Sequence, residues 1–308
     1  MEDYDYYPHK PDLVEKKSNK GVSKSIFSLL LFIMAFSIIG IEDFTFILFL
    51  VIVILIHELG HFVMMKVFKY KDVQMMFVPF MGAFVKGTPR AKNQTHSVLV
   101  LLGGPLPGIL IGIVLLFLNK TYQLEWLGEL AFLFLFLNSL NLIPLDPLDG
   151  GQLLKLLINK KQERFQLVFS FISSIIMILA GWYFQEWIIV IFGFLMGFRV
   201  RAIQKNYQIH KELDDQDVNY VTSYQALSNK DFSFIKQSVL NFTPALRTYI
   251  EQVSDESVDP IIATQVNNVL IVPVKKNATF FFKIMVILSW ISAFTAPFIA
   301  AYFLKIFS

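Results

Sequence analysis

The chain contains no cysteine and carries little charge. The absence of cysteine among its 308 residues excludes disulfide bonds and thiolate metal ligands. Only 17% of the residues are Asp, Glu, Lys or Arg, whereas soluble domains average about 25%. The net charge of +3 gives no electrostatic basis for binding nucleic acid, so we expect no nucleic-acid partner. The first 23 residues are polar, and we therefore expect no cleavable signal peptide.

Apolar residues are abundant instead. They make up 55% of the chain, and phenylalanine alone occurs 32 times. About seven apolar runs approach the length that a bilayer requires, so we predict an all-α polytopic membrane protein with about seven transmembrane helices. The runs are Ser25–Ile41, Phe44–Phe68, Ser97–Leu118, Leu124–Ile143, Phe165–Phe184, Trp187–Phe198 and Thr279–Phe303.

Basic residues alternate between the loops that connect these runs. Clusters precede the first run and follow the second, fourth and sixth, whereas the opposite loops hold only Lys120. The clusters are Lys10, Lys16, Lys17, Lys20 and Lys24; Lys66, Lys69, Lys71, Lys86, Arg90 and Lys92; Lys155, Lys160, Lys161 and Arg164; and Arg199, Arg201, Lys205 and Lys211. Because basic loops stay on the inner side, we expect a cytoplasmic N-terminus. Without an organelle signal, we expect the cell membrane.

The runs divide the chain into four parts. We expect a cytoplasmic polar tail at 1–24, a transmembrane domain at 25–204 with its core at 44–152, and a C-terminal transmembrane helix at 279–308. Between them, 205–278 is polar and predicts a small cytoplasmic α+β segment. Two stretches in it are typical of helices, "YQALSNKDFSFIKQSVL" and "PALRTYIEQV", and "NVLIVPV" is typical of a strand.

The second run contains the sequence HELGH. His57 and His61 are one helical turn apart, so both rings can reach one metal ion, and Glu58 can act as a general base beside it. Charged groups in the middle of a membrane helix cost about 2.5–3.5 kcal/mol each on insertion scales. Such a group needs a partner, and we predict a catalytic Zn²⁺, which requires a third protein ligand.

The end of the fourth run supplies candidates for that ligand. "LIPLDPLDGG" contains Asp146 and Asp149 among prolines and glycines that suit a loop folded back into the bundle. The residues themselves do not decide which of these two carboxylates is the third metal ligand. Asn138, one turn before Asn141, either lines the same cavity or bonds across helices. Gly104, Gly108 and Gly112 recur every four residues and predict close helix packing.

These motifs resemble the site-2 protease family of intramembrane zinc metalloproteases. HELGH matches the family's first motif, and "NLIPLDPLDGG" at 141–151 matches its second. "VPFMGAFVKG" is similar to the family's membrane-associated β segment, and "GGPLPG" to its Gly-Pro segment, although Pro107 departs from that pattern. The resemblance covers about Phe44–Gln152. It implies that Asp149 is the third zinc ligand and that Asn141 holds the substrate carbonyl.

The β segment allows two interpretations. Gly82, Ala83 and Phe84 either capture an unwound substrate by adding a strand or belong to a hairpin at the membrane surface. We expect His96 to be interfacial, and His9 and His210 to be solvated.

Together these features predict an intramembrane zinc endopeptidase that hydrolyses transmembrane segments of membrane proteins within the lipid bilayer. Two alternatives remain. One is a different membrane zincin with a downstream glutamate as third ligand, for which the candidates are Glu125, Glu129 and Glu163. The other is a non-catalytic membrane-helix binding protein with structural zinc, against which the intact Glu58 argues.

Overall fold

The computed structural model describes residues 7–13, 21–38, 43–78, 82–89, 92–158, 162–253 and 258–304. Some of the residues considered above lie outside these ranges, and nothing further is said of their structure. They are the last part of the first apolar run, Pro79–Met81 of the β segment, and the basic residues Lys16, Lys17, Lys20, Arg90, Lys160 and Lys161.

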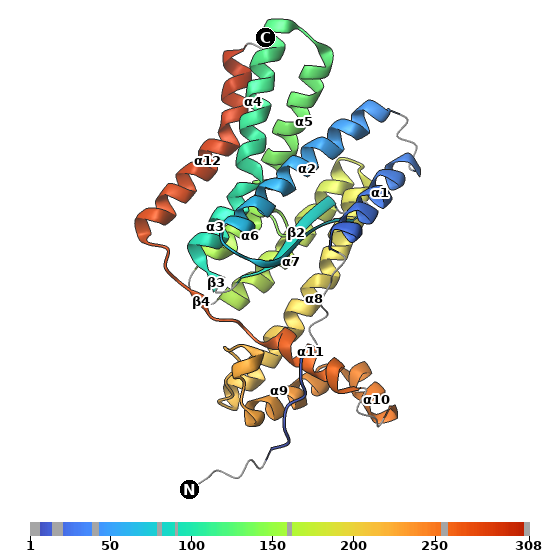
Figure 1. Cartoon of the computed structure of the whole chain (residues 1–308), viewed down its shortest axis with the longest axis vertical. Coiled ribbons are helices and arrows are strands. Elements are labelled where there is room, and N and C mark those ends of the chain that lie inside the picture. The colour runs from blue at the N-terminus through green and yellow to red at the C-terminus, as the bar shows by residue number, and fades with distance from the viewer. Residues whose placement is uncertain are drawn as a thin grey trace.

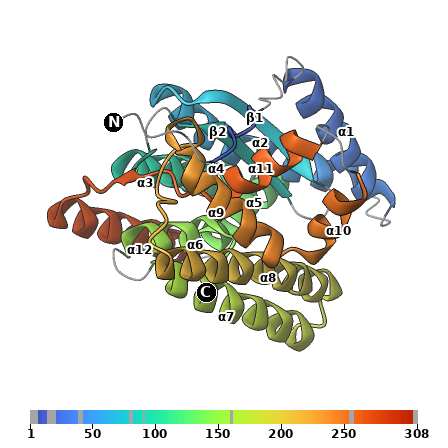
Figure 2. The same ribbon diagram turned by 90° about the horizontal axis from the view of Figure 1, so that it is seen from below.

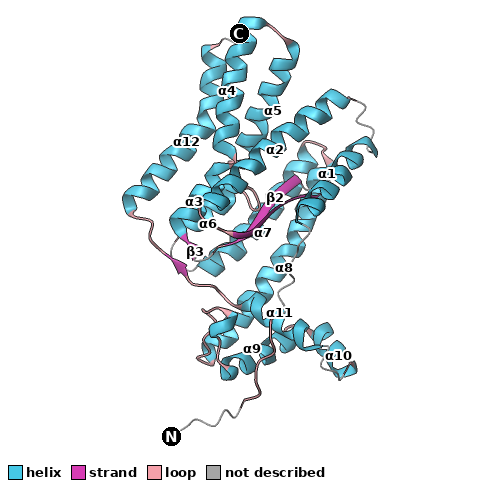
Figure 3. Cartoon of the chain, in the orientation of Figure 1, coloured by secondary structure: helices cyan, strands magenta, loops and turns pink. Residues whose placement is uncertain are grey.

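The described chain is mostly helical, with two small sheets (Figures 1 and 3). The helices are α1 (Gly21–Ile38), α2 (Phe44–Val67), α3 (Gln94–Gly103), α4 (Pro105–Tyr122), α5 (Glu125–Asn141), α6 (Asp149–Leu157), α7 (Gln162–Tyr183), α8 (Trp187–Asp215), α9 (Asn229–Asn241), α10 (Pro244–Gln252), α11 (Asp259–Val269) and α12 (Phe280–Phe303), with a 3₁₀ turn, η1, at Tyr224–Ala226. The strands are β1 (Lys71–Val78), β2 (Gly82–Thr88), β3 (Lys92–Asn93) and β4 (Val274–Lys275).

Five helical segments in the described ranges are long and apolar enough to cross a membrane. They are Phe44–Val67, Gln94–Tyr122, Glu163–Tyr183, Trp187–Asp215 and Phe280–Phe303. The two other expected runs form shorter elements. The apolar part of α1 extends only from Ser23 to Ala35, and α5 has 17 residues. The prediction of a polytopic helical membrane protein is therefore confirmed for five candidate spans, and the predicted number of seven is not.

Helix α8 differs from the expectation for its region. The short apolar run at Trp187–Phe198 continues without a break into polar sequence, giving a helix of 29 residues. The expected boundary at 204/205 falls inside this helix. Figure 1 shows α8 passing from the apolar bundle down to the lower end of the molecule. Its last turns bury Ile209 and Leu213 against helices that follow it in the sequence.

Within the described residues the segment after α8 is mostly helical, and its strand content is limited to β4 (Val274–Lys275), so the predicted α+β character is not confirmed. We call the end of α8 from residue 205 together with η1, α9, α10 and α11 the helical unit. "NVLIVPV" does not form the expected strand, because α11 extends to Val269 and only Val274 of this stretch lies in a strand. The two expected helices are confirmed as α9 and α10. Ile235, Val266 and Tyr224 lie in the apolar core of the unit.

The β segment is a hairpin beside the bundle. Strands β1 and β2 pair antiparallel, with Phe77 opposite Ala83 and Met76 opposite Phe84. Helix α1 covers β1, since Phe77 N–H donates to Ser28 Oγ at 3.1 Å and the Phe77 ring packs against Phe32. Within the described residues β2 pairs with no strand other than β1, so its second edge makes no strand pairing.

Small residues bring α4 close to its neighbours, as the glycine spacing predicted. A Cβ at Gly104 would lie 2.4 Å from His61 Nε2, and one at Gly108 would lie 2.3 Å from the Asn138 side chain. A Cβ at Gly112 would lie 2.7 Å from Leu135. Helix α4 therefore packs directly against both α2 and α5.

The tightest approach joins α2 to the end of α3, which gives a test of the packing. A Cβ at Gly60 would lie 1.9 Å from the Gly103 carbonyl oxygen, and that backbone is held inside the bundle. We expect Gly60→Ala to lower the unfolding free energy by about 1–3 kcal/mol through overpacking. Thermal unfolding in detergent micelles measures the effect.

The matched control is Gly197→Ala on α8, where the added Cβ meets only Ser174 Oγ at 3.7 Å. Alanine favours a helix over glycine by about 1 kcal/mol, so this variant should be unchanged or more stable. Equal stability of the two variants would contradict the close packing of α2 on α3.

Candidate metal centre

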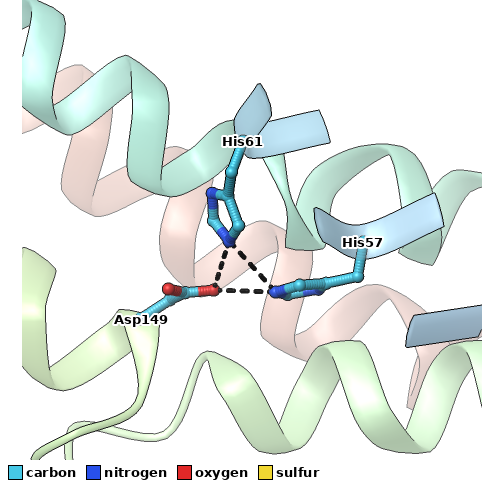
Figure 4. A group of neighbouring side chains, drawn as sticks. All are labelled: His57, His61 and Asp149. Carbon is cyan, nitrogen blue, oxygen red and sulfur yellow. Dashed lines mark hydrogen bonds and ion pairs between the residues drawn. The ribbon is translucent and has the colours of Figure 1, made fainter. Parts of the chain in front are cut away.

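His57, Glu58 and His61 lie on the buried face of α2, while Leu59 and Val63 on the opposite face are exposed. Figure 4 shows both imidazole rings pointing toward Asp149, which begins α6. His57 Nε2 is 3.0 Å and His61 Nε2 is 3.2 Å from Asp149 Oδ2, and the two Nε2 atoms are 3.1 Å apart. Two helices that are distant in the sequence thus bring three ligand-type atoms into one small triangle.

The loop before α6 places Asp149. The chain turns after α5 and folds back, so that Gly150 and Gly151 lie directly on its backbone. A Cβ at Gly150 would lie 2.2 Å from the Leu142 carbonyl oxygen, and one at Gly151 would lie 2.3 Å from that of Leu145. Trp290 of α12 donates to the same Leu142 oxygen at 2.7 Å. The loop therefore folds back into the bundle, as its prolines and glycines predicted.

Hydrogen bonds fix the orientation of both rings. His57 Nδ1 lies 2.8 Å from Asn138 Oδ1, and His61 Nδ1 lies 2.8 Å from the Val100 carbonyl oxygen. Since Asn138 Nδ2 donates to Phe134 O, its Oδ1 is the acceptor for His57. Each neutral imidazole has one N–H, and both are used at Nδ1. Both Nε2 atoms then present lone pairs.

Two imidazole lone pairs and a carboxylate oxygen within about 3 Å repel one another unless a cation lies between them. A tetrahedral ion with bonds of about 2.0–2.1 Å to nitrogen separates its ligand atoms by about 3.3 Å. The observed separations of 3.0–3.2 Å are close to that value. The nitrogen and carboxylate donors also match the ligands that zinc prefers. The site therefore fits a tetrahedral divalent metal ion.

Glu58 lies beside this triangle on the buried face of α2. The hairpin lies close to it, since Val85 of β2 lines the same cavity. Glu58 Oε2 is buried without a protein hydrogen-bond partner, so it keeps free lone pairs beside the histidines. A free carboxylate oxygen in this position is what a general base requires.

A cavity of about 610 Å³ opens onto the three residues and Glu58. Ala83 and Phe84 of the hairpin line it, and so does Asn141 at the end of α5, whereas Gly82 is not among the lining residues. Asn141 Nδ2 donates to Leu137 O at 3.0 Å, which leaves a second amide hydrogen. Helix α8 also contributes to the lining, through Met196 and Arg199.

Asp146, the rival carboxylate, faces away from the histidines. Its side chain is only 1% exposed and accepts hydrogen bonds from Lys155 Nζ at 2.7 Å, Gln152 Nε2 at 3.0 Å and Ser170 Oγ. Arg199 lies 3.7 Å from it. The structure therefore separates the two aspartates. Asp149 joins the histidines, and Asp146 ties the loop to α6, α7 and α8.

The remaining candidates lie elsewhere. Within the described residues, His57, His61 and Asp149 are the group of three whose ligand atoms come within 4.8 Å of one another. Glu125 lines a different pocket at the start of α5, and Glu129 is not a member of the group. Glu163 pairs with His210 at 3.1 Å. The alternative in which one of these glutamates is the third metal ligand is therefore wrong.

The expectation for His210 was also wrong, because this residue is buried rather than solvated. Its Nε2 lies 2.7 Å from the Val269 carbonyl oxygen, and its ring stacks on Tyr220. His9 is exposed, as expected. His96 is half-buried and stacks on Phe68, and its interfacial position stays a prediction.

No contact between Asn138 and a histidine was predicted from the sequence. Of the two alternatives for this residue, the bond across helices is confirmed, and its partner is His57. A polar side chain one turn before Asn141 in an apolar helix was the available signal. From the sequence, Arg199 contributes only to the predicted membrane topology, because its place on the cavity wall depends on how α8 packs.

A buried His-His-Asp triangle within a bundle of apolar helices defines a class of membrane metalloprotein. The comparisons agree with this class. The model of Peptidase family M50 matches residues 45–125, which include the HELGH motif and end before Asp149. The match confirms the resemblance to the site-2 protease family, so this stretch is a Peptidase family M50 segment.

Two curated relatives are similar over part of the chain. A zinc metalloprotease of Methanocaldococcus jannaschii is 30% identical over 139 residues, 43% of this chain. Stage IV sporulation protein FB of Bacillus subtilis is 30% identical over 119 residues, 36% of this chain. The chain spans about 40% of the length of each relative. The solved site-2 protease from Methanocaldococcus jannaschii shares 24% identity, with a TM-score of 0.44 over 57% of this chain and 86% of that one.

The Asp146 pair gives a stability prediction. In Asp146→Ala, the buried Lys155 ammonium loses its carboxylate partner, and breaking a buried pair in this way costs about 3–5 kcal/mol. We expect a markedly lower thermal unfolding midpoint in detergent.

Two controls accompany this variant. Glu251→Ala removes an exposed pair with Arg247 and should change little. Asp146→Leu combined with Lys155→Met removes both charges and should recover part of the loss. An Asp146→Ala protein as stable as the parent would mean that this pair does not hold the loop.

Proposed function

We propose that this chain is an intramembrane zinc endopeptidase that hydrolyses peptide bonds in transmembrane segments of membrane proteins. The observation that carries the proposal is the triangle of His57, His61 and Asp149 with Glu58 beside it at a cavity. The match of residues 45–125 to Peptidase family M50 supports the assignment, and so does the name of the zinc metalloprotease relative.

His57, His61 and Asp149 would hold the zinc ion. When bound there, zinc acidifies a water molecule and polarises a peptide carbonyl. Asn138 and the Val100 carbonyl keep the rings turned so that Nε2 faces the ion. Such outer partners also increase the basicity of the ligands.

The other roles belong to groups around the cavity. Glu58 accepts the proton of the attacking water at its free carboxylate oxygen and passes it to the leaving amine. Asn141 donates its second amide hydrogen to the carbonyl oxygen of the substrate. Gly82, Ala83 and Phe84 present the outer edge of β2, along which an unwound substrate segment adds as a strand. The position of Ala83 and Phe84 on the cavity wall supports this role.

We further propose a cell-membrane protein with all seven runs embedded and a cytoplasmic N-terminus. In this topology the tail at 1–24 and the segment at 205–278 lie on the cytoplasmic side, flanking the transmembrane domain at 25–204, and the helix at 279–308 leads outward. Hydrogen bonds between residues 10–11 and the helical unit support placing both on one side. The active site then faces the cytoplasmic half of the membrane.

Glu58→Gln tests whether the site catalyses hydrolysis. The amide keeps the size of the side chain but is not a base, so we expect cleavage to fall about 10²–10⁴-fold. Membrane fractions of cells that express the parent or the variant are compared by terminal-peptide proteomics. We expect fragments with new ends inside transmembrane segments only with the parent, and intact substrates bound to the variant.

The non-catalytic alternative makes the opposite prediction. A membrane-helix binding protein with structural zinc needs the three ligands but no base. If Glu58→Gln retains zinc and yields the same fragments as the parent, the endopeptidase assignment is lost. Asp149→Ala is the companion variant, and it should lose zinc under either function.

Variants of Asn138 and Asn141 distinguish metal binding from catalysis. We expect Asn138→Leu to weaken zinc binding about 10–100-fold, because His57 loses the acceptor that orients it. Asn141→Ala lies on the same helix and should keep full zinc while cleavage falls. Zinc content is measured by mass spectrometry during titration with a chelator, and equal zinc retention by both variants would remove the role given to Asn138.

A further inference from the structure

The N-terminal segment Tyr7–Leu13 lies on the helical unit, more than 200 residues away in the sequence. At the lower end of Figure 1 it runs beside α9 and α11, and Figure 2 views this end directly. Tyr7 makes a ring contact with Phe234, and Leu13 packs against the apolar core of the unit. The segment is therefore held at both ends by apolar contacts.

Lys10 occupies the centre of this segment. Its ammonium group donates to three backbone carbonyl oxygens, at 2.8 Å to Tyr224, 3.1 Å to Gln225 and a short bond to Leu227. It also lies 5.4 Å from the centre of the Tyr224 ring. These carbonyls belong to the 3₁₀ turn η1 and the residue after it, where a helix end leaves acceptors that need partners.

The peptide backbone on either side of Lys10 is recognised as well. Lys10 N–H donates to Asn229 Oδ1 at 3.1 Å, and the Tyr224 hydroxyl donates to the Pro11 carbonyl at 2.6 Å. Burial and the nearby carboxylates of Asp12 and Asp259 raise the pKa of Tyr224, so its hydroxyl keeps the proton it donates. Pro8 and Pro11 flank the lysine and favour an extended backbone. The helical unit thus binds this short peptide through both main-chain hydrogen bonds and side-chain contacts.

The carbonyl arrangement selects an unmodified lysine. An ammonium group has three donors around one point, which matches three converging oxygens. An arginine presents its donors in a flat fork, and acetylation removes the charge and leaves one N–H. Both changes remove hydrogen bonds to these carbonyls. The bonds to Tyr224 and Leu227 are part-buried and the bond to Gln225 is exposed, so the loss costs most at Tyr224 and Leu227.

We propose that the helical unit contains a peptide-recognition site for an extended segment with a free lysine between prolines. Its resident ligand is the chain's own Tyr7–Leu13. The site ties the N-terminal tail to the helical unit. Acetylation of Lys10 is a chemical change that would release the tail. This site is independent of zinc and of the proposed protease activity.

The test uses a variant that lacks residues 1–13 but keeps the rest of the chain, purified in detergent micelles. A fluorescent peptide covering residues 5–15 is added, and binding is followed by anisotropy. We expect saturable binding to the shortened chain. The intact chain should bind at least about tenfold more weakly, because its own segment occupies the site. Peptides with acetyl-lysine or arginine at position 10 should also bind at least about tenfold more weakly to the shortened chain.

Three results would overturn the proposal. They are failure of the peptide to bind the folded, shortened chain, equal binding of the acetylated peptide, and equal binding by the intact chain. Cleavage activity and zinc content are not used as readouts, so loss of the protease assignment leaves this test unaffected.

A second measurement covers the case in which the shortened chain does not fold. Hydrogen exchange at the Lys10 amide is compared in the intact parent, Lys10→Gln and Lys10→Arg. Asn229 protects this amide in the parent, and both variants should lose most of that protection. Pro244→Ala at the start of the exposed helix α10 is the control and should keep it. Unchanged protection in both Lys10 variants would mean that the carbonyl site does not hold the segment.

Discussion

Three lone-pair acceptors that face one another inside a bundle of apolar helices are the constraint on which the rest of the structure depends. His57 Nε2, His61 Nε2 and Asp149 Oδ2 lie 3.0–3.2 Å apart, which is unfavourable unless a cation lies between them. The protein keeps these atoms close together through contacts to the two rings on the side away from the triangle. Asn138 holds one ring and Val100 holds the other, while Gly104 lets α4 approach His61 closely.

The loop that carries Asp149 is secured by a second polar cluster. Asp146, three residues earlier, accepts hydrogen bonds from Lys155 on α6 and Ser170 on α7, so the ligand loop is tied to two helices. The side chains of Gln94 and Lys283 donate to the last carbonyls of α6, at Leu156 and Leu157. The same sequence motif thus holds two aspartates with separate tasks, one at the metal centre and one in the framework.

The sequence alone determined the helical membrane character and the pairing of His57 with His61. Both follow from local rules, since long apolar runs require helices in lipid and residues four apart share a helix face. The turn residues around Pro144 and Gly150 also indicated a loop that folds back. Resemblance to the site-2 protease family favoured Asp149 over Asp146, and the packing agrees.

Tertiary structure decided the features that depend on distant contacts. Residue spacing does not encode that Asn138 meets His57, that His210 is buried against Tyr220, or that α8 continues beyond Phe198 into the helical unit. The failed strand at "NVLIVPV" has a similar cause, because burial of Val266 and Val269 in the core extends α11 into it. The placement of Lys10 on the carbonyls of η1 joins residues 214 or more positions apart. Such a contact exists only once the helical unit has folded, because its acceptors are backbone atoms that are available from any sequence.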